Sequence, residues 1–157
     1  MQVQVLNRER FKLLLISKYG NFMDIHKDNH NCYISISNND EDIIYPDGSN
    51  YLNLRFDDIT DQETAWKDEI LFDVVDAYRI IQFMESNKEV DTAYVHCAAG
   101  ISRSASVGLF INDVWAKQPY STLEWKSWVH PNPHVSRVLN MVYRFTINTG
   151  IGRSIIE

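Results

Sequence analysis

Apolar and polar positions alternate in some parts of the chain and recur with a helical period in others, and each change of period predicts a new element. Residues 3–6, 32–37 and 51–56 are short stretches rich in strand-forming side chains. Residues 92–95 form an apolar run bounded by polar residues, which is typical of a strand buried on both faces of a parallel sheet. Residues 38–50 contain Asn, Asp, Pro and Gly and are expected to form a loop.

Helical periods mark several of the segments between and after these strands. Residues 8–17 predict the first helix, and residues 104–117 predict one that is apolar on nearly every side and ends before Pro119. Asn132 followed by Pro133 predicts the N-cap and the first helical position of the last helix. The core-facing side chains expected on this last helix are Val135, Val138, Leu139, Val142 and Phe145.

The start of the longest predicted helix is left open by the sequence. A capping box at residues 60–63 would open it, and Thr64 is an equally good N-cap. A second capping box, at residues 121–124, predicts a short helix that runs to about Trp128. The apolar face expected on the long helix consists of Ile70, Val74, Ala77, Ile81 and Met84.

Strands that alternate with helices predict an α/β fold with a parallel sheet. We expect a single three-layer domain over residues 1–157, with a central, mostly parallel sheet of about four to five strands flanked by helices. A chain of 157 residues buries enough surface to be stable without disulfides or a structural metal. With 45% hydrophobic and 23% charged residues, the composition excludes a disordered or fibrous chain.

Charge and hydropathy narrow the range of partners. The formal net charge is −6 and the Lys and Arg residues do not cluster, which argues against a nucleic-acid partner. No apolar run approaches the ~20 residues needed to cross a bilayer, and the N-terminus lacks the features of a secretion signal. We therefore expect a cytoplasmic protein without a membrane partner, whose two cysteines, Cys32 and Cys97, form no disulfide framework.

The chemically informative segment is residues 92–104, where the buried strand runs into Cys97 and a helix begins near Arg103. Parallel α/β sheets bind ligands at the carboxyl ends of their strands. Backbone N–H groups of the connecting loop and the positive end of the new helix form a nest for a phosphate-like dianion, and they favour the thiolate of a cysteine at its base. Arg103 adds a bidentate fork for two phosphate oxygens, and Gly100 permits a positive φ or a close backbone approach.

Residues 96–104, His-Cys-Ala-Ala-Gly-Ile-Ser-Arg-Ser, resemble the His-Cys-x-x-Gly-x-x-Arg-Ser/Thr signature loop of the cysteine-based protein tyrosine phosphatase superfamily. Within it the chain resembles the small dual-specificity phosphatases, including compact bacterial and phage forms. Residues 51–58 resemble the strand that ends in the family's general-acid aspartate, and residues 131–132 resemble the Pro-Asn before its last helix. The resemblance implies a dual-specificity phosphatase-like fold, with the signature loop at residues 96–104 and a general-acid loop at about residues 57–64.

The resemblance also implies the catalytic roles. Cys97 would attack phosphorus as a thiolate and form a phosphocysteine, while Arg103 would hold the phosphate oxygens. Asp58 would protonate the leaving group and then activate water. Asp57, one residue away, is the competing assignment for this acid.

Further residues of the signature loop receive supporting roles from the same resemblance. Ser104 would donate a hydrogen bond to the departing sulfur, and His96 would orient the loop from behind. No metal and no cofactor is implied, because the loop N–H groups and the arginine supply the positive field. The residues that would bind the substrate phosphate are Ala98, Ala99, Gly100, Ile101, Ser102 and Arg103.

Three functions fit these residues. The first is a protein phosphatase acting on phosphotyrosine, with phosphoserine and phosphothreonine left open. The second is a phosphatase with the same loop acting on a phosphoinositide or an RNA 5′-triphosphate, but such relatives usually carry basic residues in the loop and none stands between Cys97 and Arg103. The third is a phosphopeptide-binding module, which typically lacks the cysteine, arginine or acid. We therefore expect a phosphorylated protein or peptide as the partner. The sequence leaves the oligomeric state open, and a monomer is the favoured expectation.

Two other groups of residues have simpler interpretations. His26 and His30 have the spacing of a zinc-binding pair on a helix, but the Asn and Asp residues around them predict a solvated loop. Cys32 is expected to be buried in mid-strand. The resemblance allows a reversible disulfide between Cys32 and Cys97, which the sequence does not favour.

Overall fold

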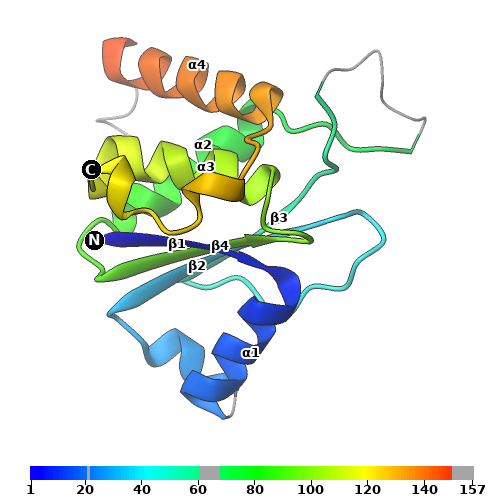
Figure 1. The fold of residues 1–157 in the computed structure, drawn as a ribbon, viewed down its shortest axis with the longest axis vertical. Helices are drawn as coiled ribbons and strands as arrows, with labels where there is room; N and C mark the ends of the chain where they lie inside the picture. Colours follow the sequence, from blue (N-terminus) through cyan, green and yellow to red (C-terminus); the bar gives the residue numbers. More distant parts are fainter. Residues whose placement is uncertain (21, 61–67, 150–157) are drawn as a thin grey trace.

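A parallel sheet of four strands lies at the centre of the protein (Figure 1). The computed structural model describes residues 1–20, 22–60 and 68–149. All strand pairings are parallel, and β4 has a neighbour on each side, as its apolar sequence predicts. The strands are β1 (Gln2–Asn7), β2 (Asn31–Ser37), β3 (Tyr51–Arg55) and β4 (Thr92–Cys97), in the order β1-β4-β2-β3.

Helices cover both faces of this sheet and complete three layers (Figure 1). α1 (Arg8–Tyr19) lies on one face together with a 3₁₀ turn at Phe22–Lys27, and the other face carries α2 (Val74–Ser86), α3 (Arg103–Ile111) and α4 (Pro133–Thr149). The predicted three-layer α/β fold is confirmed. In the described ranges, no helix is both long and apolar enough to cross a membrane.

Side chains of the strands alternate between two separate cores. In β4, Ala93, Val95 and Cys97 join the apolar core on the side of α2, α3 and α4, whereas Tyr94 and His96 contact the aromatic core on the side of α1. Because successive residues of a strand point to opposite faces, the strand that carries Cys97 is anchored on both sides. The smaller, α1-side core consists of Phe11, Leu15, Ile25, Tyr33, Tyr45 and Tyr51.

The start of α2 differs from the prediction. The helix begins at Val74 and is opened by a capping box centred on Asp73. Residues 60–63 and Thr64 therefore do not open it, and most of them lie outside the described part of the chain. Ile70, predicted on the buried face, precedes the helix and is 38% exposed, and Val74 is 52% exposed. The buried residues of α2 are Ala77, Ile80, Ile81 and Met84.

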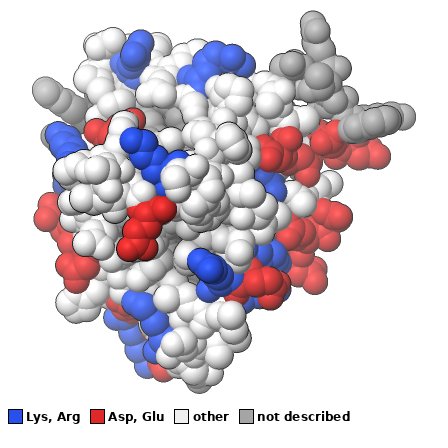
Figure 2. All heavy atoms as spheres, viewed as in Figure 1, with Lys and Arg blue, Asp and Glu red and all other residues white. Residues whose placement is uncertain are grey.

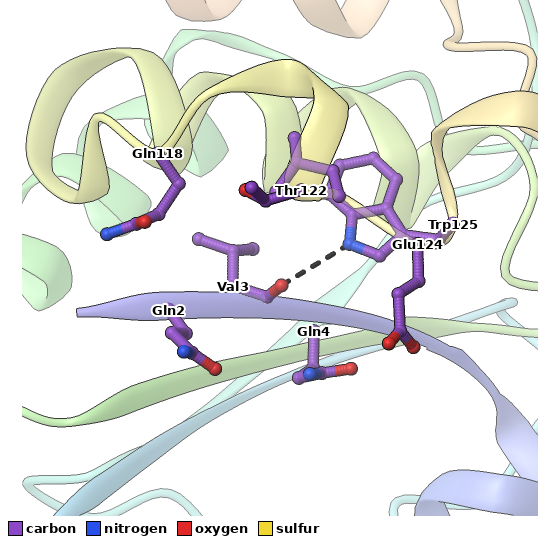
Figure 3. A pocket seen from close by; sticks show the side chains of 8 residues that line it. Gln2, Val3, Gln4, Gln118, Thr122, Glu124 and Trp125 are labelled. Atoms are coloured by element: carbon purple, nitrogen blue, oxygen red, sulfur yellow. Dashed lines mark hydrogen bonds between the residues drawn. The ribbon is translucent and has the colours of Figure 1, made fainter.

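The segment after α3 also departs from the prediction. Residues 121–124 open no α-helix; instead two 3₁₀ turns, Tyr120–Thr122 and Lys126–Trp128, flank the buried Trp125. The indole Nε1–H of Trp125 donates to the backbone oxygen of Val3 at 3.3 Å and covers the outer edge of β1 (Figure 3). A cavity of about 300 Å³ lies beside this bond, along the first residues of β1 and away from the strand's carboxyl end.

The last helix begins as predicted. Asn132 caps α4, because its side-chain oxygen accepts hydrogen bonds from the N–H groups of His134 (3.0 Å) and Val135 (3.2 Å). The core-facing prediction holds for the first half of the helix but is wrong for Phe145, which is 58% exposed. The buried members of the predicted face are Val135, Val138 and Leu139.

Candidate active site

Cys97 lies at the carboxyl end of β4, where the sheet meets the N-terminus of α3. Its side chain is buried, and its sulfur lies 3.0 Å from the hydroxyl oxygen of Ser104 in the first turn of the helix. Residues 98–102 connect the strand to the helix, which starts at Arg103. The strand, loop and helix predicted around residues 96–104 are therefore present.

The carbonyl groups of this loop accept hydrogen bonds from backbone N–H groups of neighbouring segments, which fix the loop backbone. Three N–H groups from other segments donate to them: Arg8 to Ala98 (3.2 Å), His130 to Ile101 (2.9 Å) and Asn132 to Ser102 (3.4 Å), and Ser106 of α3 also donates to Ser102 (3.0 Å). In contrast, the N–H groups of residues 98–102 have no acceptor within the described part of the chain. Unpaired N–H groups next to a helix N-terminus carry a positive partial charge, so the loop is suited to bind an anion.

Gly100 allows the loop to lie against the end of β1. Its φ is +70°, in the left-handed region that favours glycine. A Cβ atom at this position would lie 2.7 Å from the nitrogen of Asn7 and 2.7 Å from the carbonyl carbon of Leu6. Any side chain would therefore push the loop away from the sheet edge.

Arg103 is 4% exposed and is oriented by the ends of two other strands. Its Nη1 donates to the side-chain oxygen of Asn38 at 2.5 Å and to the backbone oxygen of Phe56 at 2.8 Å. Its Nε is buried and has no hydrogen-bond partner among the described residues. One edge of the guanidinium is thus fixed by the protein, while the other keeps a buried donor for a ligand.

The two candidate acids lie in different environments. One carboxylate oxygen of Asp58 accepts hydrogen bonds from the hydroxyl of Ser102 and from the side-chain amide of Asn132, both at 2.8 Å. Asp57 instead pairs with Ile70: its N–H donates to the Ile70 oxygen (2.7 Å), and its carboxylate accepts from the Ile70 N–H (2.8 Å). Asp58 therefore contacts the signature loop, whereas Asp57 is hydrogen-bonded to Ile70, thirteen residues further along the chain.

His96 lies behind the loop and is fully buried. Its Nε2 is 2.6 Å from the hydroxyl oxygen of Ser35, and the centroid of its ring is 4.1 Å from the centroid of the Phe11 ring. Burial lowers the pKa of His96 to about 3, and the positive charges of Arg8 and Arg103 act in the same direction. A neutral, fixed imidazole can hold the loop in place but does not exchange protons near neutral pH.

The other candidate residues lie away from this centre. Cys32 is buried in β2, and burial raises the pKa of its thiol to about 12. In the strand register it lies opposite Ala93, four residues before Cys97. His30 is exposed, and its Nδ1 lies 3.2 Å from a carboxylate oxygen of Asp91. The described residues contain no cluster of three or more His, Cys, Asp and Glu side chains suited to a metal ion.

Two site residues were missed by sequence reasoning. Asn38, which binds Arg103 across 65 residues of sequence, was predicted only as the first residue of a loop. Asn132 was predicted as a helix cap but not as a partner of Asp58. The signal available for Asn38 was its position directly after a parallel strand, at the sheet edge where Cys97 also lies.

Comparisons with known proteins bear on the fold alone. No family model matches the sequence, and no curated protein matches it. Among solved structures, the chain is similar to the Cydia pomonella PTP-2 phosphatase, with 15% identity and a TM-score of 0.48, over 88% of this chain and 84% of that one. The chemistry assigned to the present chain therefore rests on its own residues.

Proposed function

We propose that this protein is a cysteine-dependent phosphatase that hydrolyses phosphotyrosine in proteins or peptides. The observation that carries the proposal is the buried Nε–H of Arg103 beside the N–H groups of residues 98–102, none of which has a hydrogen-bond partner in the part of the chain that the structure describes. A buried cationic donor without an acceptor costs free energy, and a bound phosphate would supply the missing oxygens. Cys97 lies at the start of the same loop and would serve as the nucleophile.

In the first step, the Cys97 thiolate attacks phosphorus in line with the ester oxygen. The S–P bond forms while the P–O bond breaks, and Asp58 transfers its proton to the leaving oxygen. The loop N–H groups and Arg103 stabilise the phosphate oxygens as their charge changes in the transition state. An acid placed in this way contributes typically about 10²–10⁴-fold to the rate.

In the second step, water attacks the phosphocysteine. The Asp58 carboxylate takes a proton from this water, the S–P bond breaks, and the sulfur leaves as a thiolate. The Ser104 hydroxyl, 3.0 Å from the sulfur, donates a hydrogen bond that stabilises the thiolate as it departs. Phosphate and the free enzyme are the products, and no metal ion is needed for either step.

The assignment of the acid to Asp58 rests on its contacts. Ser102 and Asn132 bind the same carboxylate oxygen and hold it against the loop that would carry the phosphate. The Asp57 carboxylate instead accepts from the Ile70 N–H and, among the described residues, makes no hydrogen bond to the loop. Asp57 is the rival assignment.

Two other functions receive less support. A phosphatase of phosphoinositides or RNA 5′-triphosphates would need cationic groups for the additional phosphates, and residues 98–102 contain none. A module that only binds phosphopeptides would not need a cysteine within 3.0 Å of a serine hydroxyl, nor an aspartate held against the loop.

Replacement of the nucleophile tests the proposed reaction. In Cys97→Ser, we expect hydrolysis of p-nitrophenyl phosphate to fall to background, because a serine hydroxyl is a far weaker nucleophile than a thiolate. Binding of tungstate, measured by calorimetry, should persist because the loop and Arg103 are unchanged. Cys32→Ala is the matched control and should keep its activity; undiminished turnover in Cys97→Ser would exclude the mechanism.

A further inference from the structure

We propose that the site prefers phosphorylated residues flanked by Lys or Arg, because an acidic rim lies beside the anion-binding loop. We define the acidic rim as residues 38–42, 57–58 and 68–69, which together hold seven Asp or Glu residues and no Lys or Arg. This inference rests on the proposed phosphatase function, since the phosphate must first bind to the loop at residues 98–102. It adds the chemistry of the residues on either side of the phosphate.

One part of the rim adjoins the arginine of the site. Asn38 begins this part, and its side-chain oxygen lies 2.5 Å from Nη1 of Arg103. Asp40 and Asp42 follow within four residues, and both are exposed. A substrate whose phosphate is bound by Arg103 would therefore place its neighbouring residues near these carboxylates, since an extended peptide advances about 3.3 Å per residue.

The other part of the rim lies beside the proposed acid. Asp58 contacts Ser102 of the signature loop, and the double pairing of Asp57 with Ile70 brings residues 68–69 close to this segment. Asp68 is exposed. Figure 2 shows acidic side chains concentrated on the side of the molecule where, in Figure 1, the loops after β2 and β3 extend beyond the sheet.

The nearby arginines, Arg8 and Arg55, offset only part of this charge. Arg8 is held by the Glu41 carboxylate at 3.4 Å, the Ser37 hydroxyl at 3.2 Å and the Asp42 carbonyl. Arg55 donates to the carbonyl oxygens of Asn39 and Glu41. Both guanidinium groups keep their positive charge while they hold the backbone of the rim, so the seven acidic residues still outnumber the two arginines and the rim remains negative. The phosphate is attracted by the local N–H groups and Arg103, while its surroundings favour cationic neighbours.

A panel of matched substrates tests the preference. Three phosphotyrosine peptides of equal length, with Lys and Arg, neutral or Asp and Glu residues on both sides, are compared with p-nitrophenyl phosphate, which has no flanking residues. We expect kcat/KM to be about 3- to 20-fold higher for the basic peptide than for the neutral one, and lower for the acidic one. The difference should shrink at about 0.5 M salt because exposed charges are screened.

A pair of double variants locates the preference on the rim. Asp40→Asn/Asp42→Asn should lose most of the preference for the basic peptide and keep its activity on p-nitrophenyl phosphate. Glu89→Gln/Asp91→Asn removes the same charge at the opposite edge of the sheet, before β4 begins, and should leave the preference intact. Equal loss in both pairs would mean that net charge alone, and not the rim, sets the selectivity.

The outcomes separate this inference from the proposed function. Hydrolysis of p-nitrophenyl phosphate without a preference among the peptides, or a preference for the acidic peptide, would overturn the inference and leave the phosphatase standing. Faster hydrolysis of a phosphoinositide or an RNA 5′-triphosphate than of any peptide would overturn it as well. If no substrate is hydrolysed, the proposed phosphatase function is wrong. Binding of the three peptides, measured by fluorescence anisotropy, then tests the preference by itself. Equal affinities for the basic, neutral and acidic peptides would overturn the inference too.

Discussion

At the scale of single residues, some polar groups of the site do not make the hydrogen bonds that are usual for their positions. A serine at a helix N-cap normally accepts a hydrogen bond from the first turn, but Ser102 makes no such bond and donates to Asp58 instead. The N–H groups at the start of α3 are thereby left for a ligand. Arg103 is similar, because Nη1 donates to Asn38 and Phe56 whereas Nε has no partner in the described ranges.

Replacing the two candidate acids one at a time should identify the proton donor. In Asp58→Asn, we expect kcat for aryl phosphates to fall by about 10²–10⁴-fold, because the leaving oxygen must depart without a proton. The basic limb of the pH–rate profile should also flatten. Asp57→Asn should have a smaller effect on kcat and keep the shape of the profile. The reverse order of the two variants would assign the acid to Asp57.

His96 should make the free energy of unfolding depend on pH in acid. Its pKa is about 3 in the folded protein against 6.5 for the free side chain, so the unfolded chain binds more protons between these values. The contribution of His96 to the free energy of unfolding is fully present above pH 6.5. It is lost as the pH falls towards 3, by at most about 1.4 kcal/mol per pH unit.

Comparison of variants isolates this contribution. Burial raises the pKa of Asp76 to about 6, which acts in the opposite direction and removes stability as the pH rises. We therefore expect urea unfolding of His96→Gln to lose less stability than the parent protein between pH 6.5 and 4. His30→Gln, at an exposed position, is the control. Parallel pH dependence in His96→Gln and the parent protein would contradict the burial argument.

At the scale of elements, α4 and the acid-bearing segment are joined through one side chain. Asn132 caps α4 with its oxygen, while its Nδ2 donates to the Asp58 carboxylate at 2.8 Å and to the Ile59 carbonyl at 3.0 Å. Its own carbonyl accepts from Ser106 of α3 at 2.9 Å. The start of α4 is thus the fixed point against which the acid is positioned.

Asn132→Ser should separate this positioning role from the capping role. Serine is a good N-cap, so α4 should keep its cap, but the serine hydroxyl is too short to replace both bonds made by Nδ2. We expect kcat to fall roughly 10-fold for phenyl phosphate, which needs the acid, and less for p-nitrophenyl phosphate, whose leaving group needs it less. Equal losses on both substrates would point to a purely structural role.

Most helices and strands, but not all of their boundaries and contacts, could be predicted from the sequence. The strands and the main helices follow from hydrophobic period, and the strand–loop–helix unit around Cys97 follows from its own residues. Capping boxes were misleading at residues 60–63 and 121–124 because a cap is worth only about 1 kcal/mol. Tertiary contacts outweigh it: Asp57 pairs with Ile70, and the Trp125 side chain is buried. The bonds of Asn38 and Asn132 to the site could not be predicted, since they join residues 65 and 74 positions apart.

At the scale of the whole molecule, the sheet keeps the two sulfur atoms apart. Cys32 and Cys97 contribute to the same core, but the register places Cys32 opposite Ala93. Four residues of strand span about 13 Å, whereas a disulfide requires Cα atoms within about 7 Å of each other. Because the chain has no further cysteine, an internal disulfide that protects Cys97 would require the sheet to come apart.

Oxidation should therefore act on Cys97 alone. With limited hydrogen peroxide, we expect loss of phosphatase activity together with a sulfenic acid at Cys97, detected by dimedone labelling, and recovery with dithiothreitol. Cys32 should resist modification in the native state, because it is buried and its pKa is raised to about 12. Peptide mapping without reductant should show no link between the two cysteines. A Cys32–Cys97 disulfide formed in the folded protein would mean that the strand register in solution differs from the one described, since β2 would have to slide along β4 by about four residues.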